Sequence, residues 1–298
     1  MKRMLGLGVL ALLVLAPGCG GKSPSSSSEK IVYQSYSDSN SRPGGIYLIG
    51  ADGKGDTRLS NQPADSAGPK WSPDGRRIAF FALGAKSSSL FLIDSDGKNR
   101  RRVLTGAFTD WPAYPAWSPD GKRLVFLRGK PCDTGFCEAR LSILTIKTGK
   151  VVDVPHTSGV VFAASWSPDG RTIAFCKGLT MWLIRPDGSG ARRLTAGGDA
   201  LPAWSPDGRR IAFTRMFGAK SGIYLIRPDG TGLAPASKES GDFTAPAWSP
   251  DSREMAFVLG GVTNGDICVM PLSGKKRCLT RTAKVDDALP DWQPLPAP

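Results

Sequence analysis

The sequence contains one histidine among its 298 residues, His156. A single histidine excludes metal sites built from several histidines, and it limits any Ser-His-Asp triad to this one residue. The sequence also has no G-x-S-x-G motif, so it lacks the turn that presents the catalytic serine of α/β-hydrolases. These absences argue against the common hydrolase designs.

Long hydrophobic runs are limited to the beginning of the chain. The apolar run Leu5–Leu15 follows two basic residues and is too short to span a bilayer as a helix, but it suits a secretory signal. The Ala-Pro-Gly-Cys sequence ending at Cys19 resembles a bacterial lipobox, in which the cysteine is lipidated. We therefore expect a lipoprotein-type signal peptide over 1–18 and a Ser/Gly-rich tether over 19–29. Ordinary cleavage without a lipid is the alternative.

A tryptophan-led motif repeats along the rest of the chain. WSPDG occurs four times, followed by WSPDS and WQP, and the motifs begin at Trp71, Trp117, Trp166, Trp204, Trp248 and Trp292. Proline presets φ in a turn, aspartate bonds to nearby backbone, and glycine adopts a left-handed conformation. A Ser-Pro-Asp that recurs five times is therefore predicted to be turn chemistry, not a catalytic group.

The spacing of the motif predicts the fold. Repeats of about forty residues made of short apolar runs are typical of propeller blades with four strands each. Six such runs of the IYLI type predict an all-β, six-bladed β-propeller of four-stranded antiparallel blades over residues 30–294, followed by a tail over 295–298. The first blade lacks an inner Trp strand and the last segment has only that strand. We therefore expect the C-terminal strand to complete blade one and close the ring.

The consensus PxWSPDGxxIAF…IYLI…DG…RLT resembles the repeat of the TolB-like β-propeller family. The resemblance implies a periplasmic, non-catalytic interaction protein. TolB proteins have an additional N-terminal domain, whereas this sequence has the Ser-rich stretch before the repeats. Pectate-degrading lyases with similar repeats use several metal-binding histidines, which are absent here.

Basic residues outnumber acidic ones, 39 to 26, and follow the tight turns in clusters. The turns after the first and third strands of each blade should lie on one face, so the clusters should collect there. They are either solubilising charges or a docking surface for an anionic cell-wall polymer or lipid head groups. Nucleic acid is not expected for an exported chain. The clusters are Arg76-Arg77, Arg100-Arg101-Arg102, Lys122-Arg123, Arg192-Arg193, Arg209-Arg210 and Lys275-Lys276-Arg277.

Acidic residues lie in the loops between blades, where a closed ring would place them around the channel mouth. They would either cap turns, hold a cation such as calcium, or meet a basic partner segment. These residues are Asp65, Asp110, Asp199, Asp242, Asp286 and Asp287. Aromatic residues near them are candidate partner contacts, with packing beneath the loop as the alternative for Trp111 or Tyr114. They are Trp111, Tyr114, Phe217 and Phe243.

Five cysteines remain after Cys19. Cys268 and Cys278 flank a predicted hairpin turn at equal distances, so they can oppose one another within disulfide reach. Cys132 and Cys137 lie in one long loop, where a disulfide is favoured over a zinc site in an oxidising envelope. Cys176 is expected to be buried.

Together these observations predict an exported, lipid-anchored and monomeric interaction platform of the bacterial cell envelope that binds an unidentified envelope protein without catalysis. No cofactor is required. The alternative is a polysaccharide-binding propeller, or a metal-dependent one that cleaves polysaccharide with the channel-mouth carboxylates.

Overall fold

The computed structural model describes residues 29–37, 44–59, 65–84, 87–107, 111–132, 135–218, 220–237, 241–260, 265–272, 274–281 and 285–295. In these residues the regular secondary structure consists of 24 strands. No helix in this part of the chain is long and apolar enough to cross a membrane.

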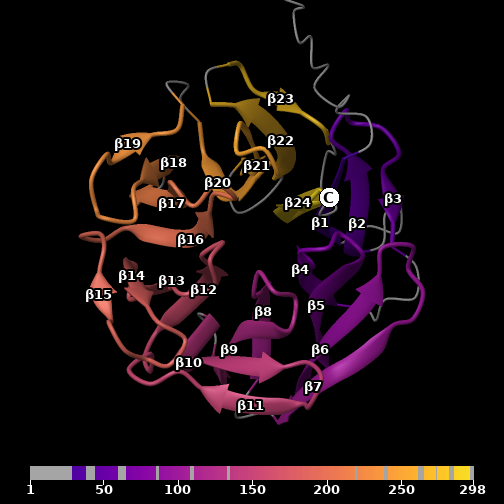
Figure 1. Ribbon diagram of the computed structural model, residues 1–298. Helices are drawn as coiled ribbons and strands as arrows, with labels where there is room; N and C mark the ends of the chain where they lie inside the picture. Colours follow the sequence, from indigo (N-terminus) through magenta and orange to yellow (C-terminus); the bar gives the residue numbers. More distant parts are fainter. Residues whose placement is uncertain are drawn as a thin grey trace, which may run out of the picture.

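The strands form six antiparallel four-stranded sheets arranged in a ring (Figure 1). The inner strands are β24 (Val285–Trp292), β4 (Ser66–Trp71), β8 (Trp111–Trp117), β12 (Val161–Trp166), β16 (Asp199–Trp204) and β20 (Phe243–Trp248). The second strands are β1 (Lys30–Ser37), β5 (Arg77–Gly84), β9 (Arg123–Cys132), β13 (Ile173–Lys177), β17 (Ile211–Phe217) and β21 (Glu254–Leu259).

The outer half of each sheet is shorter in most blades. The third strands are β2 (Gly45–Gly50), β6 (Ser87–Asp94), β10 (Gly135–Thr145), β14 (Thr180–Ile184), β18 (Lys220–Ile226) and β22 (Asp266–Pro271). The fourth strands are β3 (Thr57–Arg58), β7 (Arg101–Ala107), β11 (Lys150–Asp153), β15 (Arg192–Arg193), β19 (Ala234–Pro235) and β23 (Arg277–Cys278). We number the sheets as blades one to six, each named by its inner strand in the order given above.

The ring closes as the sequence predicts. Strand β24 at the C-terminal end pairs antiparallel with β1, with Trp292 opposite Ile31 and Asp287 opposite Ser35. The six-bladed propeller is therefore confirmed, including the completion of blade one by the C-terminal strand. Closure gives blade one its inner strand, and each of the six sheets keeps only a short inner edge that faces the axis.

The hydrophobic core is divided into six clusters, one between each pair of neighbouring blades. In the cluster between blades one and two, for example, Val32 and Ile46 pack with Trp71 and Phe80. Strands that are apolar on both faces are therefore needed, because each sheet is covered on both sides.

Hydrogen bonds define two faces of the ring. On the face that we call the tight-turn face, the turn after the inner strand meets the turn after the third strand, as where Ser95 N–H donates to Arg76 O (2.9 Å). On the opposite, long-loop face, the loop between blades meets the loop after the second strand, as where Gly178 N–H donates to Val160 O (2.9 Å). The predicted sorting of turns and loops is thus correct.

Candidate functional site: the axial channel and its long-loop mouth

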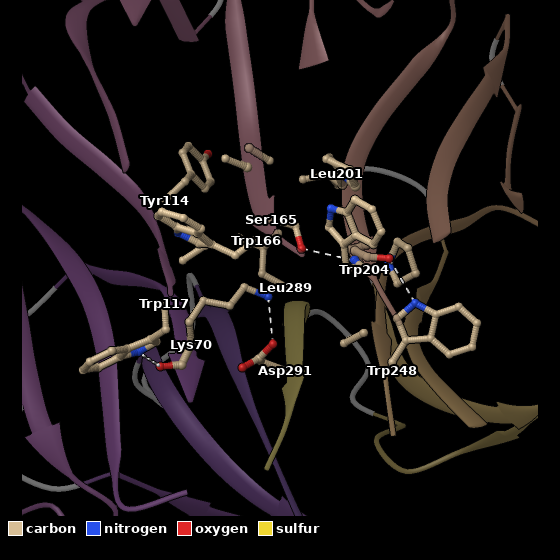
Figure 2. A pocket seen from close by; sticks show the side chains of 18 of the residues that line it. Lys70, Tyr114, Trp117, Ser165, Trp166, Leu201, Trp204, Trp248, Leu289 and Asp291 are labelled. Carbon is tan, nitrogen blue, oxygen red and sulfur yellow. Dashed lines mark hydrogen bonds and ion pairs between the residues drawn. The ribbon is translucent and has the colours of Figure 1, made fainter. Parts of the chain in front are cut away.

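The inner strands enclose a channel along the ring axis. Its cavity measures about 250 Å³ and is lined by the same short segment of all six blades, ending at the motif tryptophan. Figure 2 shows these segments converging around the axis, with Lys70, Ser165 and Asp291 presenting the polar groups. A ligand bound on the axis would therefore contact equivalent residues from all six blades.

Each inner strand contains an irregularity that shapes this lining. The residue three places before the tryptophan has a positive φ in every blade: Gly68 (57°), Tyr114 (50°), Ala163 (36°), Leu201 (53°), Ala245 (53°) and Leu289 (49°). The pairing with the second strand shifts register at the same place. This is a β-bulge, which re-aims side chains and increases local twist. All six bulge residues line the channel.

Polar groups join the inner strands across two seams. Asp291 accepts hydrogen bonds from Trp71 N–H (2.7 Å) and from Lys70 Nζ (3.0 Å). Desolvation raises the pKa of the Asp291 carboxyl, and this effect outweighs the stabilisation of its charge by Lys70 and by Trp71 N–H. In the seam between blades four and five, Trp204 N–H donates to Ser165 Oγ (3.1 Å). These contacts hold the channel wall in place.

One side of the long-loop mouth of the channel is apolar. A second cavity of about 320 Å³ lies there, lined by Tyr114, Phe162, Ala163, Leu179, Ala200, Leu201, Met216 and Leu289. The side chains of Leu179 and Met216 in this lining are 43% and 39% exposed, and that of Phe217, which follows Met216 in β17, is 52% exposed. Large apolar side chains exposed together mark interaction sites, whereas single ones do not. We call Leu179, Met216 and Phe217 the mouth cluster.

The predicted ring of acids lies mainly at the long-loop mouth but does not converge. Asp199 is fully buried and forms a bidentate ion pair with Arg215 (2.7 and 3.0 Å). Asp242 and Asp286 accept hydrogen bonds from the backbone of Ser221 and Gly265, both at 3.0 Å. These carboxylates stabilise loops, which is the turn-capping interpretation of the sequence.

The other predicted acids do not change this conclusion. Asp65 is exposed with a positive φ of 55°, Asp287 is fully buried, and Asp110 lies outside the described residues. Within the described residues, no three acidic, histidine or cysteine side chains are grouped so that they could hold a metal ion. The cation site predicted at the mouth is therefore not formed by the described carboxylates.

The four candidate aromatic contacts occupy different environments. Tyr114 lines both axial cavities and packs against Phe81, with ring centroids 5.2 Å apart. Phe217 is exposed beside Tyr224, whereas Phe243 is only 3% exposed and packs in the core between blades five and six. The prediction that Phe243 contacts a partner is therefore wrong, because its ring is buried between blades five and six. The side chain of Trp111 is outside the described residues.

The repeated Ser-Pro-Asp stabilises the turn after the inner strand by hydrogen bonds. In blade four, the Ser167 hydroxyl donates to Asp169 Oδ1 (2.5 Å), and Arg171 N–H donates to the same oxygen (3.0 Å). These two hydrogen bonds lower the pKa of Asp169 against a smaller effect of desolvation. Ser167 Oγ also accepts from Thr172 N–H (2.9 Å), which closes the turn. The same bonds to the turn aspartate occur in the other four copies.

The motif tryptophans join neighbouring blades. Trp117 Nε1 donates to Lys70 O in the preceding blade (3.1 Å), and Trp248 Nε1 donates to Ala203 O (3.0 Å). The second basic residue after three of the turns stacks on the tryptophan of the following blade: Arg77 on Trp117, Arg123 on Trp166 and Arg210 on Trp248. The second residue of each of these basic pairs therefore packs between two blades.

The cysteines divide into three groups. Cys268 and Cys278 oppose one another in β22 and β23 and form a disulfide, as their spacing predicts. Cys176 is a free, buried cysteine, and burial raises the pKa of its thiol far above the ordinary value. The side chains of Cys132 and Cys137 lie outside the described residues, so their predicted disulfide stays a prediction.

Two features of the channel have signals in the sequence that the predictions above do not use. Proline stands two places before the tryptophan in five of the six inner strands, and this marks the bulge. Lys70 and Asp291 both directly precede a motif tryptophan, where the other four repeats have alanine or serine. Since ring closure makes the first and last motifs neighbours, aligning the repeats would have predicted the ion pair.

Comparisons with known proteins agree with this geometry. A family model described as the TolB beta propeller domain matches residues 22–176. The structure of TolB from Acinetobacter baumannii is 21% identical, with a TM-score of 0.76, and the alignment covers 91% of this chain and 68% of that one. A putative TolB from Agrobacterium tumefaciens is 18% identical, with a TM-score of 0.64, over 90% of this chain and 100% of that one.

A solved enzyme also shares the architecture. An oligogalacturonate lyase in complex with manganese is 19% identical, with a TM-score of 0.58, over 80% of this chain and 71% of that one. Similarity at these identities shows a common fold and does not transfer an activity.

Proposed function

Because the chain belongs to the family of the TolB beta propeller domain, we propose that it is a non-catalytic protein-interaction platform of the bacterial cell envelope. The chain is exported by its N-terminal signal and held at a membrane by a lipid on Cys19. It binds an envelope protein at the long-loop mouth of the channel. The mouth cluster is the observation that carries this proposal, because it exposes three large apolar side chains beside an apolar cavity.

The position of the mouth cluster supports a protein partner over a sugar polymer. Sugar-cleaving sites need carboxylates that can reach the substrate, yet Asp199 is paired with Arg215 and Asp242 caps a backbone N–H. Exposed Leu179 and Met216, in contrast, are side chains that bury favourably against another apolar surface. The mouth thus favours apolar protein contacts over the alternative of polysaccharide cleavage.

Crosslinking in native envelopes tests the platform. We expect the double variant Leu179→Asn/Met216→Gln to lose the crosslinked partner that the wild-type chain captures. Asparagine tolerates the left-handed backbone of Leu179 (φ 58°), so folding should be preserved. The matched control is Val152→Gln/Leu295→Gln, which removes two exposed apolar side chains from the outer strand β11 and from the segment after β24. Equal capture by both double variants would refute the role of the mouth.

A separate measurement tests the anchor. Metabolic labelling with a fatty-acid probe should mark the wild-type chain and should not mark Cys19→Ala. An unlabelled wild type, or a label that persists in the variant, would contradict lipidation while leaving the crosslinking result interpretable.

A further inference from the structure

The tight-turn face carries a ring of cations close to the axis. The residue five places after each motif tryptophan is basic and exposed in blades two to six: Arg76, Lys122, Arg171, Arg209 and Arg253. The backbone N–H of each residue is held by its turn aspartate, as in Arg209 N–H to Asp207 Oδ1 (3.0 Å). The backbone is thus fixed by the turn while the cationic side chain extends toward solvent.

A second ring of cations lies outside the first. The turn after the third strand contains an exposed basic residue in every blade: Lys54, Lys98, Lys147, Arg185, Arg227 and Lys275. Further exposed arginines begin the fourth strands, among them Arg101, Arg192, Arg193 and Arg277. The turn aspartates on this face offset part of the charge, and the arginines that begin the fourth strands add to it.

The charge of the long-loop face is nearly balanced. In its described residues, Asp65, Asp242 and Asp286 stand near the mouth, and Asp266 begins β22. Its basic side chains include Lys130, Lys177 and Lys220. The excess positive charge of the protein is therefore concentrated on the tight-turn face, where it would attract an anionic surface.

The described chain starts on the same face. Glu29 O accepts a hydrogen bond from Ala51 N–H (2.8 Å) at the turn that follows β2, and Glu29 Oε2 accepts from Trp292 Nε1 (2.8 Å). Ten residue steps separate Glu29 from Cys19, and they can span at most about 35 Å. A lipid on Cys19 would thus hold the tight-turn face, and not the long-loop face, next to the membrane.

We infer that the tight-turn face docks on an anionic phospholipid surface, so that the long-loop mouth points away from the membrane toward its partner. The inference rests on the lipid anchor of the proposed function. Anionic head groups attract basic side chains within about one Debye length of the surface, and the tether lets the two rings of cations come that close. The lipid anchor keeps the protein near the membrane, and the cations orient the tight-turn face toward it.

Lysine acetylation of the native lipidated protein tests this orientation. The protein is inserted into preformed vesicles of phosphatidylcholine, with or without phosphatidylglycerol, and acetylated with a membrane-impermeant reagent. The modification rate of each lysine is read by mass spectrometry. In vesicles with phosphatidylglycerol we expect severalfold slower modification of Lys54, Lys98 and Lys275, with no change at Lys130 and Lys220. Salt at 1 M, where the Debye length is about 3 Å, should remove the protection.

Two charge-matched variants provide the control. Arg76→Gln/Arg171→Gln/Arg209→Gln should abolish the protection of Lys54 and Lys275, because it removes three cations of the inner ring. Lys130→Gln/Lys177→Gln/Lys220→Gln changes the net charge equally on the other face and should leave the protection intact. Loss of protection in both variants would indicate an effect of net charge only and would refute a docking face.

Other outcomes separate this inference from the proposed function. The mass of the mature chain is measured first: a missing lipid would overturn both the anchor and the orientation. A lipidated chain with equal lysine rates in both vesicle types would overturn the orientation alone. Protection by a soluble polyphosphate polymer, without protection by phosphatidylglycerol, would assign the face to a wall polymer and refute docking on lipid.

Discussion

Lys70 and Asp291 form an ion pair across the seam at which the ring closes, with Nζ 3.0 Å from Oδ1. Asp291 belongs to the C-terminal strand of blade one, and Lys70 belongs to the inner strand of blade two. The same carboxylate accepts the N–H of Trp71 (2.7 Å). One side chain thus joins the last strand of the chain to the inner strand of blade two. The strand that closes the ring is therefore bonded to the neighbouring blade as well as to its own.

Removing this connection should destabilise the whole ring. Asp291→Ala leaves the Trp71 N–H without its acceptor and Lys70 without its counter-charge, which should lower the free energy of unfolding by about 2–3 kcal/mol. Asp291→Asn keeps an acceptor for Trp71 N–H, so its cost should be about 1 kcal/mol. Urea unfolding of the two variants checks this order. Equal losses would show that the hydrogen bond to Trp71 contributes nothing beyond the ion pair.

A second prediction concerns the glycine of the bulge in blade two. A Cβ at Gly68 would lie 2.8 Å from Cε1 of Phe81, so Gly68→Ala should cost about 1–3 kcal/mol by overpacking. The positive φ adds strain of its own, which Ala163 and Ala245 tolerate in other blades, so the steric part is read from its coupling to Phe81. Urea unfolding should show that Phe81→Leu, which shortens the opposing side chain, reduces the added cost of Gly68→Ala. Strict additivity of the two substitutions would contradict the steric explanation.

Much of the fold could be predicted because its signals are local. The turn chemistry of WSPDG depends on residues within one hairpin, and counting its copies predicts both the number of blades and the closing strand. The axial site depends instead on contacts between blades. The acids depend on strand register within a blade as well: Asp199 lies on the predicted face, but its pairing with Arg215 depends on how β16 aligns with β17 in blade five. Likewise, no feature of the segment around Phe243 predicts its burial against blade five.

The arginine that stacks on a motif tryptophan offers a third prediction. The guanidinium of Arg123 lies 4.9 Å from the ring centroid of Trp166, a cation–π contact worth about 0.5–1 kcal/mol at such sites. Arg123→Thr should therefore lower the free energy of unfolding by that amount. Threonine is chosen because Thr172 occupies this position in blade four. The adjacent, exposed Lys122→Thr is the control and should be neutral in the same urea titration. Equal losses in both variants would indicate a general effect of charge.

The disulfide of blade six gives a fourth prediction. It joins residues separated by 10 positions, and a closed loop of this length is expected to stabilise the fold by about 3 kcal/mol. The double variant Cys268→Ser/Cys278→Ser should show this loss in urea unfolding under oxidising conditions, and wild type with a reductant should match it. Unfolding that is insensitive to the reductant would refute the contribution. The buried Cys176 should react with a thiol reagent only after unfolding.

Two aspartates should change the free energy of unfolding in opposite directions as the pH rises. Hydrogen bonds to Ser167 and to Arg171 N–H lower the pKa of Asp169, so the folded state releases its proton more readily than the unfolded chain. Its contribution is present above the unfolded pKa of about 3.9 and is lost as the pH falls through the lower folded value. Desolvation raises the pKa of Asp291, so the folded state retains that proton longer, and stability falls as the pH rises above about 4.

Urea unfolding between about pH 2.5 and pH 6 separates the two groups. Relative to wild type, Asp169→Asn should lose stability above about pH 4 and approach wild type at lower pH. Asp291→Asn should gain stability relative to wild type as the pH rises above about 4, because the wild-type carboxyl is costly to ionise in the folded state and asparagine carries no charge. The effect of Asp169→Asn should be small because its carboxylate is exposed, so the equivalent substitution of Asp74, Asp120 and Asp207 in the same chain should amplify it. Parallel pH profiles for the turn variants and Asp291→Asn would contradict the assigned directions.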